Sequence, residues 1–341
     1  MTGSGTPPQI AVIIPAWNAQ ATLRRAVSSA LAQEQVAAEV IIVDDASADG
    51  TLDCAKALAA KDGRVRVLAQ PENRGPAAAR NLALENISAP YAAPLDSDDF
   101  MEPGRLARLL RIAEQGNWDF VADDLFKVPE TGIEGPRTRL WSEDSIGIQP
   151  LGFSAFVRGN LSGQRGGRRE LGFIKPLMSV GFLNRASLRY DTGMRLGEDY
   201  ILYATALARG ARFCLTDPAG YVAVTRPDSL SGVHSACDLG ALVQGDRTLM
   251  AAENLTKAEQ AALKEHYIET LKKWHWLRMI DAVKTRDFAA AIRCFQAPPA
   301  VIGDLFGKLG EQVVIRGAAR LPFRAAGPGA LKNKNRRGGS P

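Results

Sequence analysis

Closely spaced cysteines are missing from this 341-residue chain. The four cysteines that it has are far apart, and no Cys-x-x-Cys pair occurs. Because zinc sites built on cysteine use such pairs, the spacing disfavours a zinc centre. We expect reduced, mostly buried thiols at Cys54, Cys214, Cys237 and Cys294.

Long apolar segments are missing as well. No window approaches the roughly 18 consecutive apolar residues that a membrane-spanning helix needs. Residues 1–8 are small and polar, without the basic start and apolar run of a signal peptide, so we expect a flexible N-terminus and a cytoplasmic chain. With 46% hydrophobic and 23% charged residues, the composition is that of a folded α/β protein.

A third absence concerns the loop after the first expected strand, 10–14. The residues that follow it, 15–20, read Pro-Ala-Trp-Asn-Ala-Gln and contain no glycine. Dinucleotide-binding dehydrogenases carry a glycine-rich loop at this place, and so do sugar-1-phosphate nucleotidyltransferases. The sequence therefore disfavours both classes, and the nucleotidyltransferase is kept as an alternative.

Strand and helix patterns alternate over the first hundred residues. Short apolar runs at 10–14, 40–43, 65–68 and 91–95 predict buried strands, and the spacing of apolar residues predicts helices over 21–32, 49–60 and 77–86. Such alternation predicts an α/β fold with a doubly wound, mostly parallel sheet.

The pattern changes twice further along the chain. Residues 129–169 are rich in Gly, Arg and Ser and predict a long, partly mobile connection over the site, followed by strand character at 175–184, a helix at 199–209 and a strand at 221–224. Residues 238–297 and 305–319 predict helices. We therefore expect an α/β domain over 9–235, a helical C-terminal region over 236–325 and a disordered basic tail over 326–341.

Polar groups follow three of the expected strands at the points where they end. They are Trp17-Asn18, Asp44-Asp45 and the acidic run Asp96-Ser97-Asp98-Asp99. Ligands of parallel α/β sheets bind beyond the carboxyl ends of the strands, so these groups should meet at one edge.

Three carboxylates crowded in the acidic run repel one another unless a cation offsets them. Aspartate oxygens are ligands that Mg²⁺ and Mn²⁺ prefer. The alternative is that Asp98 or Asp99 caps the next helix. The position after a buried strand favours a metal site.

Other polar residues have both structural and functional interpretations. Asp44 could accept a hydrogen bond from a uracil-type base, whereas Asp45 and Asp49 suit helix capping. The helix opened by Gly75-Pro76 suits phosphate, and Arg80 could pair with Asp44 or with a nucleotide.

Two adjacent carboxylates, Glu198 and Asp199, stand at the start of an expected helix, where the helix dipole favours negative charge. The functional interpretation makes Asp199 a general base toward an acceptor hydroxyl.

Taken together, these motifs resemble those of the family 2 glycosyltransferases, which are inverting enzymes with the GT-A fold. The resemblance covers roughly residues 8–235, and within the family the chain is most similar to the single-sugar glucosyltransferases of succinoglycan synthesis, of the ExoU and ExoW type. The matching segments, in order, are Ile13–Asn18, Val43–Ser47, Asn73–Gly75 with Ala79–Asn81, Asp96–Asp99 and Gly197–Asp199. The finer similarity lies in Glu72–Pro76, Leu196–Tyr200 and Asp228–Gly232.

The resemblance implies a nucleotide-binding half over 9–128 and an acceptor half over 129–235. It implies a divalent cation, Mg²⁺ or Mn²⁺, held by Asp98 with Asp96 and His234, and Asp199 as the base with Glu198 beside it. The residues expected to bind the nucleotide are Pro15, Ala16, Asn18, Asp44, Arg80, Asp96 and Ser97.

The implied reaction is a single displacement that transfers one sugar, glucose from UDP-glucose, to a lipid-linked or soluble saccharide. The Gln-x-x-Arg-Trp element of processive synthases is missing, which favours one addition per encounter. No nucleic-acid partner is expected. The 305–319 helix and the basic tail either contact the inner face of the membrane or form a packed helix with a solvated end. A non-catalytic nucleotide-sugar-binding protein is the remaining alternative.

Overall fold

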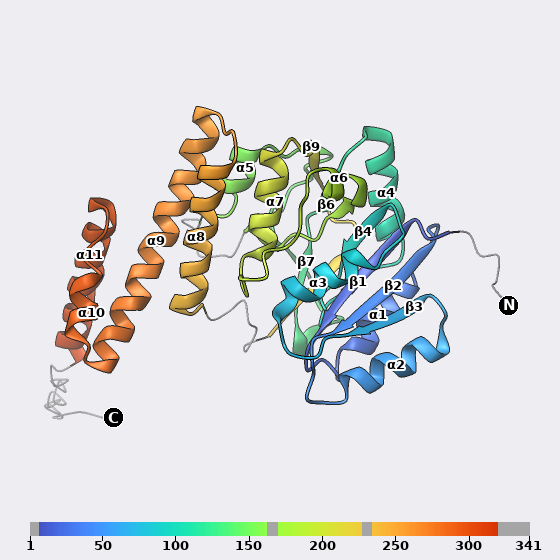
Figure 1. Ribbon diagram of the computed structural model, residues 1–341, viewed down its shortest axis with the longest axis horizontal. Coiled ribbons are helices and arrows are strands. Elements are labelled where there is room, and N and C mark those ends of the chain that lie inside the picture. The colour runs from blue at the N-terminus through green and yellow to red at the C-terminus, as the bar shows by residue number, and fades with distance from the viewer. Residues whose placement is uncertain (1–6, 162–169, 227–233, 320–341) are drawn as a thin grey trace, which may run out of the picture.

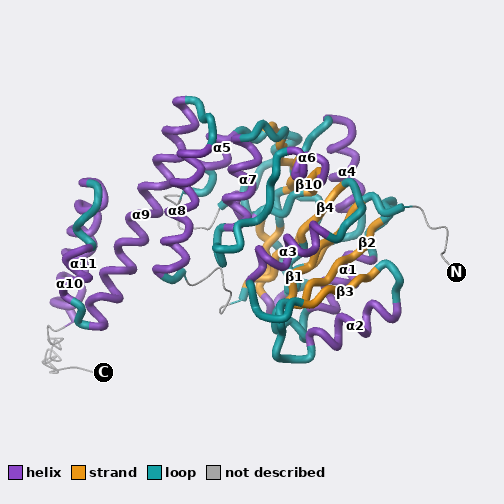
Figure 2. Tube along the Cα trace, in the orientation of Figure 1, coloured by secondary structure: helices purple, strands orange, loops and turns teal. Residues whose placement is uncertain are grey.

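The computed structural model describes residues 7–161, 170–226 and 234–319 (Figure 1). The expectations for residues 1–6 and for the basic tail, and the motif Asp228–Gly232, lie outside the described residues. Figure 2 shows an α/β body that contains the strands and a C-terminal part that contains only helices.

The first half of the body confirms the predicted alternation. Four parallel strands stand in the order β3-β2-β1-β4, with β1 in the middle because its apolar run is buried on both faces. The strands are β1 (Ile10–Ala16), β2 (Ala38–Asp44), β3 (Val65–Ala69) and β4 (Tyr91–Pro94), and the helices are α1 (Leu23–Leu31), α2 (Thr51–Lys61) and α3 (Gly75–Glu85).

The chain order of these strands reverses once, between β3 and β4. Crossovers between parallel strands are right-handed, so α1 and α2, which contact each other, cover one face of the sheet, and α3 covers the other face. The reversal leaves the ends of β1, β2 and β4 facing one crevice, as in other doubly wound sheets.

The second half continues the sheet as β10-β6-β11-β9 with mixed strand directions. β10 runs antiparallel to both neighbours, β6 and β11 are parallel, and β9 is antiparallel to β11. The elements are α4 (Arg105–Gly116), β6 (Phe120–Asp123), β9 (Gln149–Pro150), β10 (Leu177–Ser179), α6 (Val180–Arg185), α7 (Glu198–Ala208) and β11 (Phe213–Thr216).

A small second sheet, which the sequence pattern did not predict, has the order β5-β12-β7-β8. It joins β12, predicted at 221–224, to the segment directly after the acidic run. The strands are β5 (Phe100–Met101), β7 (Phe126–Pro129), β8 (Thr138–Arg139) and β12 (Tyr221–Thr225).

Two predictions for residues 129–184 are wrong in part. The expected connection 129–169 contains a short helix, α5 (Phe153–Arg158), as well as β8 and β9. The expected strand 175–184 ends after β10, because the hydroxyl of Ser179 accepts a hydrogen bond from the Phe182 amide and starts α6. Elements this short bury little surface alone, so their apolar patterns are too brief to identify.

The C-terminal region is helical, as predicted, with α8 (Ala236–Ala252), α9 (Lys257–Thr285), α10 (Phe288–Arg293) and α11 (Pro299–Ala319). Capping boxes at Ser235–Asp238 and Thr256–Glu259 start α8 and α9. α9 packs on α5 and α8 on α7, whereas α10 and α11 contact the far part of α9 (Figure 1).

None of the described helices has the length and apolar character that crossing a membrane requires. All four cysteines are free thiols, as expected; Cys214 and Cys294 are buried, Cys54 is half-buried and Cys237 is exposed.

Candidate active site

The loops after β1 and β2 are joined by side chains at the carboxyl edge of the sheet. The amide of Asn18 donates to the Ser47 hydroxyl at 3.0 Å, and the Asn18 side-chain oxygen accepts from the amide of Ala48 at 2.9 Å. Asn18 has φ 49°, a left-handed conformation that asparagine tolerates. The neighbouring Trp17 is exposed, and Pro15 and Ala16 continue β1 beneath it.

The two carboxylates after β2 have different roles. Asp45 is an anchor, because its oxygens accept from the amides of Arg74 and Gly75 at 2.8 Å and thereby hold the start of α3. Asp44 is buried, and its Oδ2 accepts from the Ser47 amide at 3.2 Å. Its Oδ1 is buried with no hydrogen-bond partner within the described part of the chain. A buried oxygen of this kind suits an N–H donor from a ligand.

Asp99 fixes the acidic run to the second sheet. Its carboxylate accepts from the Val224 amide and from the Tyr221 hydroxyl, both at 2.8 Å, and that hydroxyl accepts in turn from the Asp96 amide. Burial raises the pKa of Asp99 well above its ordinary value, and the charges of Asp96 and Asp98 raise it further. Asp99 is therefore part of the scaffold, and it anchors β12 instead of capping a helix.

Asp98 is the acid of this run whose carboxylate accepts no hydrogen bond from another residue within residues 7–161, 170–226 and 234–319, and only its own main-chain amide reaches it. The nearest cation is Arg226, at 3.7 Å. Burial raises the pKa of Asp98, and the charge of Asp96 raises it further, while Arg226 and Lys175 lower it. A divalent cation would offset this repulsion, so the donor chemistry of Asp98 fits Mg²⁺ or Mn²⁺.

The predicted ligand set as a whole is less complete. Within the described ranges, no group of three or more His, Cys, Asp or Glu side chains is placed to hold a metal. His234 is half-buried just before α8. Asp96 is engaged by two cations, as described next. Asp96 and His234 as metal ligands stay predictions.

Two buried cations gather the remaining acids. Arg80, on α3 and 3% exposed, donates to Asp96 at 2.8 Å and to Glu198 at 2.7 Å. Lys175, just before β10, lies 2.7 Å from Asp199 and 3.0 Å from Asp96. Arg80 is also 3.7 Å from Asp199. We call these five residues the charge cluster. It brings together the acidic run and the predicted catalytic pair, which are about a hundred residues apart in sequence.

The charges of the cluster are interdependent. Burial would raise the pKa of Asp96, but Lys175 and Arg80 hold it below its ordinary range. Burial would lower the pKa of Lys175, but Asp199 and Asp96 raise it above its ordinary value. Burial and the charge of Asp199 raise the pKa of Glu198, against the effect of Arg80. Losing one member would leave buried charge without its partner, at a cost of about 3–5 kcal/mol.

Lys175 was not among the predicted site residues. A single lysine in a segment with strand character gives no signal, and its role depends on a second buried pair. Arg105 donates to the Lys175 carbonyl and to Asp123, both at 2.6 Å, while Asp123 accepts from the Tyr221 amide. This pair ties Lys175 to the strand that carries Tyr221.

Arg80 does not pair with Asp44, which is one of its two predicted partners. Its ion pairs run to the charge cluster, and none joins it to Asp44 among the residues described. Ser97 lies half-buried between Asp96 and Asp98. The expected contacts of Arg80, Asp96 and Ser97 with a nucleotide stay predictions.

The helix that carries the predicted catalytic pair, α7, is attached to the C-terminal region by side-chain contacts. Tyr200 donates to Asp246 on α8 at 3.1 Å and stacks on His266 of α9, with ring centroids 4.4 Å apart. The Nδ1 of His266 lies 2.8 Å from Asp246. These three buried side chains fix the direction in which the start of α7 points.

The chain is similar to known proteins in sequence and in fold. Residues 11–172 match the family described as Glycosyl transferase family 2. The chain is 38% identical over 336 residues to the succinoglycan biosynthesis protein ExoU of Rhizobium meliloti (strain 1021), with 96% of each chain covered.

Two solved structures share the fold at low identity. TarS of S. aureus, residues 1–349 in complex with UDP-GlcNAc, has a TM-score of 0.62 and 16% identity, and the match covers 84% of this chain and 90% of that one. The mannosyltransferase PcManGT of Pyrobaculum calidifontis, in complex with GDP-Man and Mn²⁺, has a TM-score of 0.57 and 17% identity, covering 92% and 80%.

Proposed function

Because the chain belongs to the family 2 glycosyltransferases and has their GT-A fold, we propose that it transfers a single glucose from UDP-glucose to an acceptor hydroxyl with inversion. The observation that supports this most is the charge cluster, in which Asp199 and Glu198 stand across Arg80 and Lys175 from Asp96. A donor-side acid and an acceptor-side acid thus flank one position at the carboxyl edge of the sheet.

On the donor side, Asp44 accepts the N–H of the uracil ring through its buried, unpaired Oδ1. Asn18, Pro15 and Ala16 form the floor beneath the nucleoside. Asp98 holds Mg²⁺ or Mn²⁺, and such an ion neutralises the charge that develops on a departing diphosphate. A similar structure is complexed with Mn²⁺, which agrees with this choice of ion.

On the acceptor side, Asp199 removes the proton from the attacking hydroxyl. Lys175 and Arg80 hold Asp199 and Glu198 in place before any substrate arrives, so little reorganisation is required. One direct displacement at the anomeric carbon turns an α-linked donor into a β-glycoside. No covalent intermediate is needed.

The acceptor is a lipid-linked oligosaccharide of exopolysaccharide synthesis, made at the cytoplasmic face of the membrane. Support comes from the similarity over nearly the full length to a succinoglycan biosynthesis protein. The missing Gln-x-x-Arg-Trp element favours addition of one sugar per encounter. The chain then works in the cytoplasm, in peripheral contact with the inner face.

A panel of nucleotide sugars tests the donor. Release of UDP from UDP-glucose with Mg²⁺ or Mn²⁺ present should exceed release of nucleotide from the GDP-, ADP- and TDP-linked sugars, and EDTA should abolish it. A protein that binds UDP tightly but never releases it from any donor would instead be a nucleotide-sugar-binding protein. NMR of the product distinguishes inversion from retention.

A further inference from the structure

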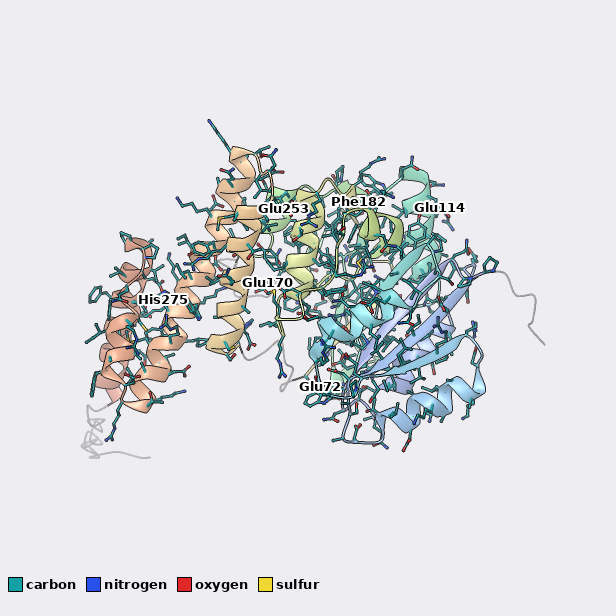
Figure 3. All side chains as sticks on the ribbon, viewed as in Figure 1. Glu72, Glu114, Glu170, Phe182, Glu253 and His275 are labelled. Atoms are coloured by element: carbon teal, nitrogen blue, oxygen red, sulfur yellow. The ribbon has the colours of Figure 1, made fainter. Side chains whose placement is uncertain are left out.

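Large apolar side chains lie exposed at the end of the molecule remote from the charge cluster. Phe288 and Ile292 on α10 are 78% and 68% exposed, and Phe306 on α11 is 62% exposed. In Figure 3, the labelled His275 marks the α9 segment beside these two helices, and its Nδ1 lies 2.9 Å from the carbonyl of Cys294, directly after α10. Four of the six large apolar residues found exposed among those described are in α9–α11.

These side chains form one continuous surface. Phe288 and Ile292 are spaced i, i+4, so they project from the same side of α10. Phe295, after the helix, is half-buried and packs against Met279, Cys294 and Leu305. The Phe295 and Phe306 rings lie 5.2 Å apart, which joins α11 to this row. We call these four residues the α10 face. Contiguous exposed apolar surface on a folded protein marks a binding surface.

Cations border the α10 face. Lys284, in the last turn of α9, and Arg286, the residue directly after that helix, are exposed, and no ion pair to either is present in the described residues. Arg293 lies on α10 itself, 3.9 Å from Asp287, and Lys308 on α11 pairs with Asp304 at 2.8 Å. With Asp281 and Glu311 included, residues 281–311 carry four acids and four cations, so the charge beside the α10 face is balanced up to Glu311.

The positive excess of this part of the chain begins after Glu311. The residues that follow it contain seven arginines and lysines and no aspartate or glutamate up to residue 341. A second copy of the chain seated on the α10 face would bring two such cationic segments together, which Coulomb repulsion opposes. An anionic surface would attract both.

We propose that the α10 face docks on an anionic lipid bilayer, with its apolar side chains among the acyl chains and Lys284, Arg286 and the following cations at the phosphates. Apolar insertion and charge attraction together give reversible binding without a spanning helix. The inference rests on the proposed function, because the bilayer is where a lipid-linked acceptor would be presented. The α10 face, however, needs no nucleotide sugar to bind.

Vesicle flotation of the full chain tests the docking. The protein should float with phosphatidylcholine vesicles that contain about one-third phosphatidylglycerol, and not with phosphatidylcholine alone, since an anionic surface attracts the lysines and arginines. Raising the salt concentration should weaken the binding. Equal binding to both kinds of vesicle, or to neither, would overturn the proposal.

Two matched variants locate the surface. The double change Phe288→Ser and Ile292→Ser should weaken partition by about tenfold or more, because both side chains leave the apolar layer. Ile148→Ser, at another exposed apolar position 51% exposed, should change nothing. Both positions are on the surface, so folding should persist, which circular dichroism checks.

Deleting residues 320–341 should also weaken binding, by about tenfold or more. Stronger binding after the deletion would mean that the tail covers the α10 face. If the parent protein is a dimer and the double variant is a monomer, a second copy covers the face. Either result would overturn the proposal. UDP release measured without vesicles should be unchanged in every variant. Failure of UDP release with vesicle binding intact would count against the proposed function only.

Discussion

The part of the α/β domain before residue 128 and the part after it hold their polar groups by different means. In the first part, Asn18, Asp44 and Asp45 stand at the ends of long parallel strands, and main-chain amides fix them. In the second part, Lys175, Glu198 and Asp199 stand beside short elements, and buried ion pairs to Arg80 and Asp96 fix them.

This difference has consequences for substitutions. Asp44 accepts from one amide and leaves its other oxygen unpaired, so its loss should act on the donor more than on the fold, unlike loss of the anchor Asp45. A carboxylate or cation of the charge cluster shares its charge balance with four others, so its loss should act on turnover, stability or both. Four substitutions, two in each part of the domain, test this contrast.

The largest effect is expected from Asp199→Asn. Turnover should fall by about 10²–10⁴-fold, because the amide cannot accept the acceptor proton. UDP affinity, measured by calorimetry, should remain near that of the parent protein. Asp191→Asn, at an exposed position upstream of α7, is the control and should retain full activity. Normal turnover in Asp199→Asn would mean that another group is the base.

Lys175→Met should lower the free energy of unfolding by about 3 kcal/mol, since Asp199 and Asp96 lose a buried partner. Urea denaturation measures the change. The matched control is Lys308→Met, whose ion pair with Asp304 is at i, i+4 on one helix and should contribute about 0.5 kcal/mol at most. If the two variants lose similar free energy of unfolding, the ion pairs of Lys175 stabilise the fold no more than an exposed ion pair does.

Asp98→Ala is expected to act on the donor. The KM for the nucleotide sugar should rise by about tenfold or more, because the diphosphate loses its metal-mediated contact. Titration with Mn²⁺ should show weaker metal binding in the ternary mixture. If the variant keeps the KM and metal dependence of the parent protein, the metal is held elsewhere.

The smallest effect is expected from Asp44→Ala. Loss of one hydrogen bond from the base to a charged oxygen should weaken UDP binding by about tenfold, with kcat nearly unchanged. Asp53→Ala, at an exposed acid on α2, serves as the control. A fall in kcat at constant affinity would remove the proposed separation between the two parts of the domain.

The two parts also differed in how far their structure could be predicted. The runs 10–14 and 40–43 are apolar throughout, as strands buried on both faces must be. The strands of the first half could therefore be predicted from the apolar pattern alone. Strand β10 has only three residues and α5 only six, and tertiary contacts decide whether such segments form at all. Local propensity is too weak to identify them.

By itself, the sequence determined that carboxylates would follow the buried strands, and that the carboxyl ends of parallel strands would bring them to one edge. It also determined that two acids would begin α7 and that cations would accumulate after residue 311. These are properties of neighbouring residues, and short-range rules of chain geometry govern them.

Only the tertiary structure decided which acids became scaffold and which stayed available. Asp99 accepts hydrogen bonds from Tyr221 and Val224, while the Asp98 carboxylate beside it accepts none from any other residue in the described ranges. Lys175 reached Asp199 because Arg105 holds its carbonyl from another helix. Such choices depend on charge balance among residues far apart in the chain, since a buried charge must find its partner wherever the fold places one.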